Sequence, residues 1–238
     1  MSDLEARLRD AVQRFWITRG SQATRQSDTG DRDRGGRGAV TGGKQMDGFV
    51  NLVRDLLVEA RVPESSIATN RRVELPGWFR AEKKWDLVVV HQDELLAALE
   101  FKSQIGPSFG NNFNNRTEEA LGSATDLWAA YREGAFKPSS RPFLGYLMLL
   151  EDCEGSRSSV KVFEPQFKVF PEFREASYQG RYALFVEKLL RERLYDGACL
   201  ILAEQTTGLN GRYIEPHPEL TFTKLIRPLL SLLAGKFR

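Results

Sequence analysis

The sequence predicts an α/β protein with a mixed central β-sheet flanked by helices. Helix-like and strand-like segments alternate along the chain, which is typical of this class. The two clearest strand segments, residues 85–90 and 95–102, are apolar on both faces, as expected of central strands that helices cover on each side. The chain shows no internal repeat, and its 238 residues suffice for one full hydrophobic core. We therefore expect a single domain over residues 1–238.

Each element is indicated by a local pattern. Residues 3–17 and 47–60 carry apolar side chains at helical spacing. Residues 19–45 between them are rich in glycine and arginine and almost lack large apolar side chains, which predicts a mobile arm. A short strand is expected over residues 71–75, and a hairpin over 85–102 with its turn at 91–94. The remaining expected elements are a helix from Thr117 to Gly134, strands over 143–150 and 198–203, and helices over 181–195 and 222–234.

Composition excludes several classes of protein. The hydrophobic share of 41% and the charged share of 28% are ordinary for a globular protein, and no apolar run approaches the ~20 residues of a membrane span. The first residues carry charges throughout and do not form a signal peptide. Cys153 and Cys199 are too few for a disulfide framework or a zinc site. We therefore expect a cytoplasmic protein. Because the net charge is only +2, a nucleic-acid site would depend on local clusters of basic residues.

Two carboxylates and a lysine lie inside the apolar hairpin strands. Opposite residues of an antiparallel hairpin have residue numbers with a constant sum, so Asp86 faces Glu100 if the turn centres on Asp93. Their Cβ atoms would then be ~5 Å apart, with Lys102 on the same face. Two facing carboxylates repel unless a cation lies between them, and oxygen ligands favour Mg²⁺. Lys102 would orient or help deprotonate a water, or stabilise the transition state. The simpler alternative is a solvated salt bridge, which the apolar flanks disfavour.

These residues carry a resemblance. Asp86 with Glu100-Phe101-Lys102 resembles the signature of the PD-(D/E)xK nucleases, although Lys84-Trp85 stands where the family name has proline. The continuation EFKSQIGPSFGNNFNNRTEEA over residues 100–120 and GGKQMD over 42–47 are similar to XhoI-type Type II restriction endonucleases. The resemblance extends over nearly the whole chain.

The resemblance implies a fold, a reaction and partners. It implies a PD-(D/E)xK restriction-endonuclease-like core and a homodimeric, Mg²⁺-dependent enzyme that cleaves both DNA strands at a short palindrome, which in that family is CTCGAG. Asp86 and Glu100 would be metal ligands together with the backbone carbonyl of Phe101, and Lys102 would be the catalytic lysine. Whether one or two metal ions act stays open. A cognate DNA methyltransferase is also implied as a functional partner.

Two segments are candidates for DNA contact, and a third cluster is weaker. We expect a loop over residues 104–116, which would emerge beside the scissile phosphate, because Asn and Gln side chains can contact bases or phosphates. The basic strip of the arm is suited to following a phosphate backbone. Arg71, Arg72, Arg80, Lys83 and Lys84 could hold phosphates near the metal, or could form a solvated face. The candidate DNA-contacting residues are Gln104, Asn111, Asn112, Asn114, Asn115, Arg116, Arg32, Arg34, Arg37 and Lys44.

Other functions remain as alternatives. A DNA repair or junction-resolving nuclease of the same fold would use the same acidic site. A non-catalytic DNA-binding protein would have no need for a buried carboxylate pair, which would only cost stability. Trp78, Trp85 and Trp128 are expected in the core or at an interface. The sequence does not define which bases are read or where a dimer interface lies.

Overall fold

The central sheet of the protein has five strands in the order β1-β4-β5-β6-β7. A computed structural model describes residues 3–28 and 44–237. β1, β4 and β5 are antiparallel neighbours, whereas β5, β6 and β7 run parallel, so the sheet is mixed as the sequence predicts. The strands are β1 (Ile67–Thr69), β4 (Leu87–His91), β5 (Glu94–Gln104), β6 (Phe143–Glu151) and β7 (Gly197–Ala203).

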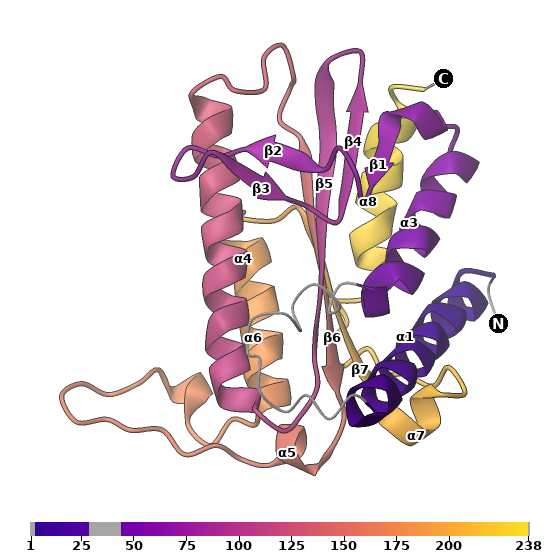
Figure 1. The fold of residues 1–238 in the computed structure, drawn as a ribbon. Helices are drawn as coiled ribbons and strands as arrows, with labels where there is room; N and C mark the ends of the chain where they lie inside the picture. The colour runs from indigo at the N-terminus through magenta and orange to yellow at the C-terminus, as the bar shows by residue number, and fades with distance from the viewer. Residues whose placement is uncertain (1–2, 29–43, 238) are drawn as a thin grey trace.

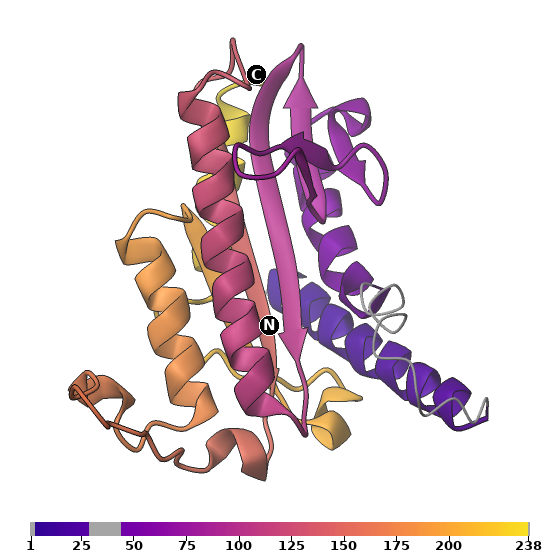
Figure 2. The same cartoon turned by 60° about the vertical axis from the view of Figure 1, so that its left-hand side comes forward.

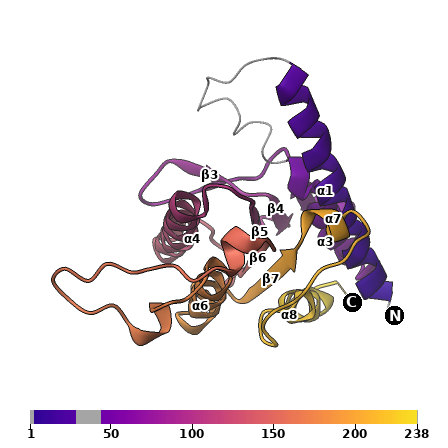
Figure 3. The same ribbon diagram turned by 90° about the horizontal axis from the view of Figure 1, so that it is seen from below.

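Helices cover both faces of this sheet, as Figures 1 and 3 show. α4 (Phe109–Arg132) and α6 (Tyr178–Arg191) lie side by side on one face (Figure 2). α1 (Asp3–Asp28), α3 (Asp47–Glu59) and α8 (Phe222–Ala234) cover the other. Each face of the sheet has its own hydrophobic cluster. Successive residues of β5 point to opposite faces, so Ala98 packs on the α4 side and Leu99 on the α3 side. The period of two along an extended strand explains this alternation.

The β4–β5 hairpin has a different turn from the one expected. Gln92 and Asp93 both have positive φ, 49° and 63°, and form a two-residue turn. His91 pairs with Glu94, but the register shifts between Val89 and Val90, so that Leu87 pairs with Leu99. A bulge thus replaces the odd-length loop. The pairing of β4 with β5 ends at Leu87 and Leu99, and the Asp86 N–H donates to the Leu99 carbonyl, so the direct pairing of Asp86 with Glu100 stays a prediction.

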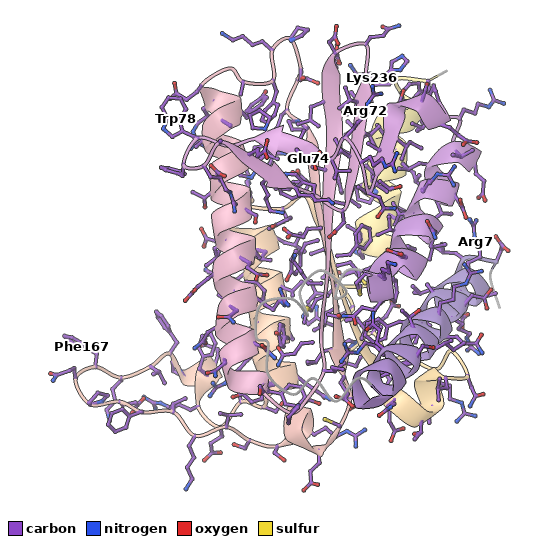
Figure 4. The ribbon with its side chains drawn as sticks, viewed as in Figure 1. Arg7, Arg72, Glu74, Trp78, Phe167 and Lys236 are labelled. Carbon is purple, nitrogen blue, oxygen red and sulfur yellow. The ribbon has the colours of Figure 1, made fainter. Side chains whose placement is uncertain are left out.

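A second, two-stranded sheet lies beside the hairpin. It consists of β2 (Glu74–Pro76) and β3 (Glu82–Lys84), so the expected strand over residues 71–75 starts three residues later and includes Pro76. Trp78 lies at the tip of this small sheet, near α4 (Figure 4), and is 59% exposed, so a core position is wrong for it. Trp85 and Trp128 are buried as predicted.

Two helices begin or end at residues that the sequence did not indicate. α4 starts at Phe109 instead of Thr117, so the expected loop over residues 104–116 is mostly helix. Phe113 packs edge-on against Tyr182 and Phe185 of α6, and this packing outweighs the low helix propensity of the asparagines. α1 continues to Asp28, so the first ten residues of the expected arm are helical. The dense glycines begin only at Gly30, and residues 29–43 lie outside the described part.

Short elements and one long connection complete the fold. The short helices are η1 (Lys44–Met46), η2 (Glu64–Ser66), α5 (Glu154–Arg157), η3 (Pro171–Phe173) and α7 (Gln205–Gly208). The connection between α5 and α6 projects from the body with Phe167 on it (Figure 4), and exposes Phe163, Phe167 and Phe170. None of the helices within residues 3–28 and 44–237 is both long and apolar enough to cross a membrane.

Candidate active site

Asp86 sits where the small sheet joins the central sheet. Trp85 donates its main-chain N–H to Val73, and Asp86 donates its own to the carbonyl of Leu99 at 3.2 Å. The Asp86 carboxylate then accepts the Phe101 N–H at 2.7 Å. This contact gives the Phe101 N–H a partner just beyond Leu87, where the pairing of β4 with β5 stops.

The open edge of β5 exposes main-chain oxygen beside the carboxylates. β5 continues to Gln104 on its β6 side, but its pairing with β4 ends at Leu99. In an extended strand the N–H and C=O of one residue point to the same side. Because the Phe101 N–H points to Asp86, the Phe101 carbonyl is directed to the same open edge. The expected third metal ligand is therefore directed to the edge at which the Asp86 carboxylate lies.

Glu100 is buried and holds two ammonium groups on one oxygen. Its side chain is 3% exposed, and its Oε1 lies 2.8 Å from Lys102 Nζ and 3.0 Å from Lys83 Nζ. Lys83 comes from β3, on the small sheet, and also lies over the Trp85 ring, 4.1 Å from its centroid. The sequence placed Lys83 only in a general basic cluster. Lys83 points inward in β3, whereas its neighbours Glu82 and Lys84 are exposed. The alternation of a short strand is the signal that could have separated Lys83 from the other basic residues of that cluster.

Burial and charge act in opposite directions on these groups. Burial favours the neutral acid of Glu100, but Lys102 and Lys83 outweigh it and lower its pKa. For Asp86 burial prevails over Lys102, and the pKa is raised. Burial lowers the pKa of Lys83, whereas Glu100 and Asp86 outweigh burial at Lys102 and raise its pKa. The site is thus two carboxylates and two ammonium groups in a poorly solvated space.

Some of the buried polar atoms left without hydrogen-bond partners belong to Glu100 and to residues whose charges interact with it or with its neighbour Tyr146. Among the described residues, five buried side-chain nitrogen or oxygen atoms have no hydrogen-bond partner, and three of them belong to Glu100, Arg116 and Tyr146. Tyr146 is the register neighbour of Glu100 on β6, and burial followed by the charge of Glu100 raises the pKa of Tyr146 well above its ordinary value. A buried polar atom without a hydrogen-bond partner costs free energy, and an ion or ligand bound beside it would satisfy it.

The residues present fit a divalent metal ion. Glu100 Oε2 is the unpartnered oxygen, and the charge of Glu100 acts on the Asp86 carboxylate. The Phe101 carbonyl is directed to the edge at which Asp86 lies. Across the described ranges, no group of three or more His, Cys, Asp or Glu side chains is arranged to hold a metal. A metal here would therefore depend on two carboxylates and a main-chain oxygen, with water in other positions. Such a set of oxygen ligands suits a hard divalent cation.

The predicted DNA-contacting residues divide into three groups. Asn111, Asn114 and Asn115 are exposed on the first turns of α4, and Asn112 and Arg116 are half-buried one turn apart. Lys44 is exposed in η1. Gln104 is buried, with its amide nitrogen donating to the Phe109 carbonyl at 3.0 Å and its oxygen accepting from Tyr182, so it serves packing in this structure. Arg32, Arg34 and Arg37 lie outside the described residues.

The fold and this acidic, lysine-bearing site define a protein with a restriction-endonuclease-like core. The family described as restriction endonuclease XhoI matches residues 25–215, and the chain belongs to this family. Over 208 residues it is 52% identical to the Type II restriction enzyme BstVI of Geobacillus stearothermophilus, which covers 85% of this chain and 93% of that enzyme.

Two further relatives carry the same description. AbrI of Azospirillum brasilense is 48% identical over 169 residues, covering 71% of this chain and 76% of that enzyme. XhoI of Xanthomonas vasicola is 41% identical over 193 residues, covering 80% of this chain and 77% of that enzyme. The comparison with solved structures found no match. The chain is therefore a Type II restriction endonuclease, a site-specific deoxyribonuclease that acts on double-stranded DNA, and enzymes of this type generally use divalent metal ions.

Proposed function

We propose that this enzyme hydrolyses a phosphodiester bond in each strand of a short palindrome, CTCGAG, with Mg²⁺ held by Asp86, Glu100 and the Phe101 carbonyl. The observation that carries the assignment is the buried, unpartnered oxygen of Glu100 at the open edge of β5. A single domain over residues 1–238 would contain the whole site. The recognition sequence rests on membership of the XhoI family.

The side chains would divide the chemistry among them. Bound Mg²⁺ would lower the pKa of a coordinated water and polarise the phosphoryl oxygen. The water would release a proton to solvent as its oxygen forms a bond to phosphorus. The bond from phosphorus to the leaving sugar oxygen would break, and that oxygen would take a proton from solvent. Lys102, which reaches Glu100 Oε1 at 2.8 Å, is close enough to stabilise the charge that develops on the phosphoryl group.

The partners and the place of action follow from this role. A palindromic site read on both strands requires two copies related by a twofold axis, so we propose a homodimer. Exposed residues at the start of α4, Asn111, Asn114 and Asn115, with Asn112, Arg116 and Lys44, are proposed to contact DNA. We propose that the enzyme acts in the cytoplasm and that a cognate DNA methyltransferase protects the host DNA.

The test uses a plasmid with a single CTCGAG site and a matched plasmid with one base pair of that site changed. In Mg²⁺ the enzyme should linearise only the first, and EDTA should stop the reaction. Cutting of both plasmids at one common position elsewhere would reject CTCGAG, and a smear would reject a site-specific reaction.

The same plasmids test the site residues. Asp86→Ala and Lys102→Ala should each reduce the cleavage rate by at least about 10³-fold, because removing one group of such a unit removes most of its catalysis. DNA binding, measured by gel shift without metal, should stay largely intact. Lys188→Ala, on the exposed side of α6, serves as the control. Cleavage by Asp86→Ala at the rate of the unchanged enzyme would refute the assignment.

A further inference from the structure

The second lysine of the site, Lys83, occupies a position that is otherwise suited to a cation. Its Nζ lies 3.0 Å from Glu100 Oε1, and its side chain is only 11% exposed, less than the 25% of Lys102. It also donates to the Lys84 carbonyl at 3.2 Å. The ammonium group is therefore held by a carboxylate, a carbonyl and the face of the Trp85 ring.

The small sheet directs this side chain inward. Lys83 pairs with the buried Leu75 of β2, while its neighbours Glu82 and Lys84 point to solvent. A lysine at the inward position of a short strand loses hydration, which costs free energy unless a nearby anion compensates for it. Glu100 is that anion, although it belongs to a strand of the other sheet and is 17 residues distant in sequence.

The balance of charges in the site determines how the ion pair between Lys83 and Glu100 affects metal binding. In the described structure the negative charges of Asp86 and Glu100 are matched by Lys83 and Lys102. A divalent ion entering this balanced set would meet two ammonium groups at close range, in a space where charges are weakly screened. When a DNA phosphate arrives it supplies the missing negative charge, and a lysine is a suitable partner for it.

We propose that Lys83 is a positioning residue that neutralises Glu100 beside the cation site in the free enzyme and moves to a DNA phosphate when substrate binds. Metal binding is then weak without DNA and strong with it, which couples the two binding events. This inference rests on the metal assignment of the proposed function and adds a regulatory role for a residue outside the Asp86, Glu100 and Lys102 set.

The test measures metal binding without DNA, so it does not depend on cleavage. Mn²⁺ is titrated by calorimetry into the full-length enzyme and into Lys83→Met, whose unbranched side chain is one atom shorter and carries no charge. The apparent affinity for Mn²⁺ should rise at least about tenfold in Lys83→Met. Lys84→Met removes the same charge from the exposed neighbouring position and should leave the affinity within about twofold.

Binding of DNA provides the second readout. Both proteins carry Lys102→Ala here to prevent cleavage. A duplex containing CTCGAG should increase the Mn²⁺ affinity of the Lys102→Ala enzyme much more than that of the same enzyme with Lys83→Met added. Lys83→Gln repeats both measurements with a second neutral side chain, and thermal melting verifies that each variant is folded. Equal Mn²⁺ affinities of the unchanged enzyme and both Lys83 variants would overturn the proposal.

The variant Glu100→Gln distinguishes a wrong role for Lys83 from a wrong assignment of the metal site. If Glu100→Gln abolishes the Mn²⁺ binding while the Lys83 variants match the unchanged enzyme, only the role of Lys83 is wrong. If Glu100→Gln and the Lys83 variants all bind Mn²⁺ as the unchanged enzyme does, the metal assignment is wrong as well. A purely structural ion pair would lower the melting temperature in Lys83→Met without raising the Mn²⁺ affinity.

Discussion

At the scale of single residues, the two carboxylates of the site differ in how their charge is supported. Glu100 is almost completely buried but has two ammonium groups on one oxygen, and its pKa is lowered by Lys102 and Lys83 against the effect of burial. Asp86 has the Phe101 N–H as its hydrogen-bond donor, and burial raises its pKa. Asp86 is therefore the residue whose ionised form costs stability when no metal is bound.

This difference predicts a stabilising substitution. A carboxyl whose pKa is raised in the folded protein holds its proton more tightly there than in the unfolded chain, so its ionised form at neutral pH opposes folding. Asp86→Asn keeps an oxygen for the Phe101 N–H and removes the charge. In EDTA at pH 7 its melting temperature should rise by roughly 1–4 °C, although cleavage is lost.

Asp93→Asn makes the same chemical change at an exposed turn position and provides the control. Its melting temperature should stay within about 1 °C of that of the unchanged enzyme. A lower melting temperature for Asp86→Asn than for Asp93→Asn would contradict the interpretation of Asp86 as a residue that costs stability.

At the scale of elements, α4 joins the site to the small sheet. Its first turns carry the asparagines and Arg116, and its second half carries Asp126, which is 3% exposed. The Asp126 carboxylate accepts the main-chain N–H groups of Trp78 and Phe79, each at 2.7 Å, and Arg80 Nε at 2.6 Å. One buried carboxylate thus fixes the tip of the small sheet on α4, and through it the strand that carries Lys83.

We predict that Asp126→Ala lowers the free energy of unfolding by about 1–3 kcal/mol, because it removes the acceptor of three hydrogen bonds. Urea unfolding followed by circular dichroism would measure this. Thr125→Ala, at the exposed neighbouring position, should change the free energy by less than about 0.5 kcal/mol. Equal stability of the two variants would show that the contact contributes nothing.

The effect of Asp126 should also depend on pH. The desolvation of Asp126 is outweighed by its bonds from Phe79, Arg80 and Trp78, so its folded pKa lies below the usual 3.8. A carboxyl with a lowered pKa contributes stability above its unfolded pKa and loses it as the pH falls through its folded pKa. The difference between the unchanged enzyme and Asp126→Ala should therefore be constant from pH 7 to about pH 5 and shrink below about pH 4.

At the scale of the whole molecule, one chain carries one acidic site, whereas a palindrome offers two scissile bonds of opposite strand polarity. Two copies related by a twofold axis place one site at each bond. The exposed large aromatic side chains of the described part lie mainly on two projections, the tip with Trp78 and Phe79 and the connection with Phe163, Phe167 and Phe170. Neither projection is covered by another segment of the described chain.

We therefore predict that the enzyme in solution has about twice the mass of the 27.0 kDa chain. Light scattering on a size-exclusion column at micromolar concentration would measure it, with and without a CTCGAG duplex. A mass of one chain in both conditions would contradict the homodimer. A change from one chain to two upon addition of the duplex would show instead that DNA assembles the dimer.

The sequence alone determined the α/β class, most of the central strands, and the placement of Asp86 and Glu100 at the β4–β5 hairpin. These features depend on apolar periodicity and on strand register, both of which are local properties. The similarity of residues 100–120 to the XhoI family then narrowed the function to restriction, and the comparisons confirm that family.

Only the tertiary structure decided the start of α4, the burial of Gln104 and the place of Lys83. Phe113 makes the Asn-rich segment helical because it packs on α6, and Gln104 is buried because Tyr182 from α6 reaches it. Lys83 meets Glu100 because a second sheet folds back over the first. Each of these contacts joins elements that are distant in sequence, and no local pattern encodes which distant surface an element will meet.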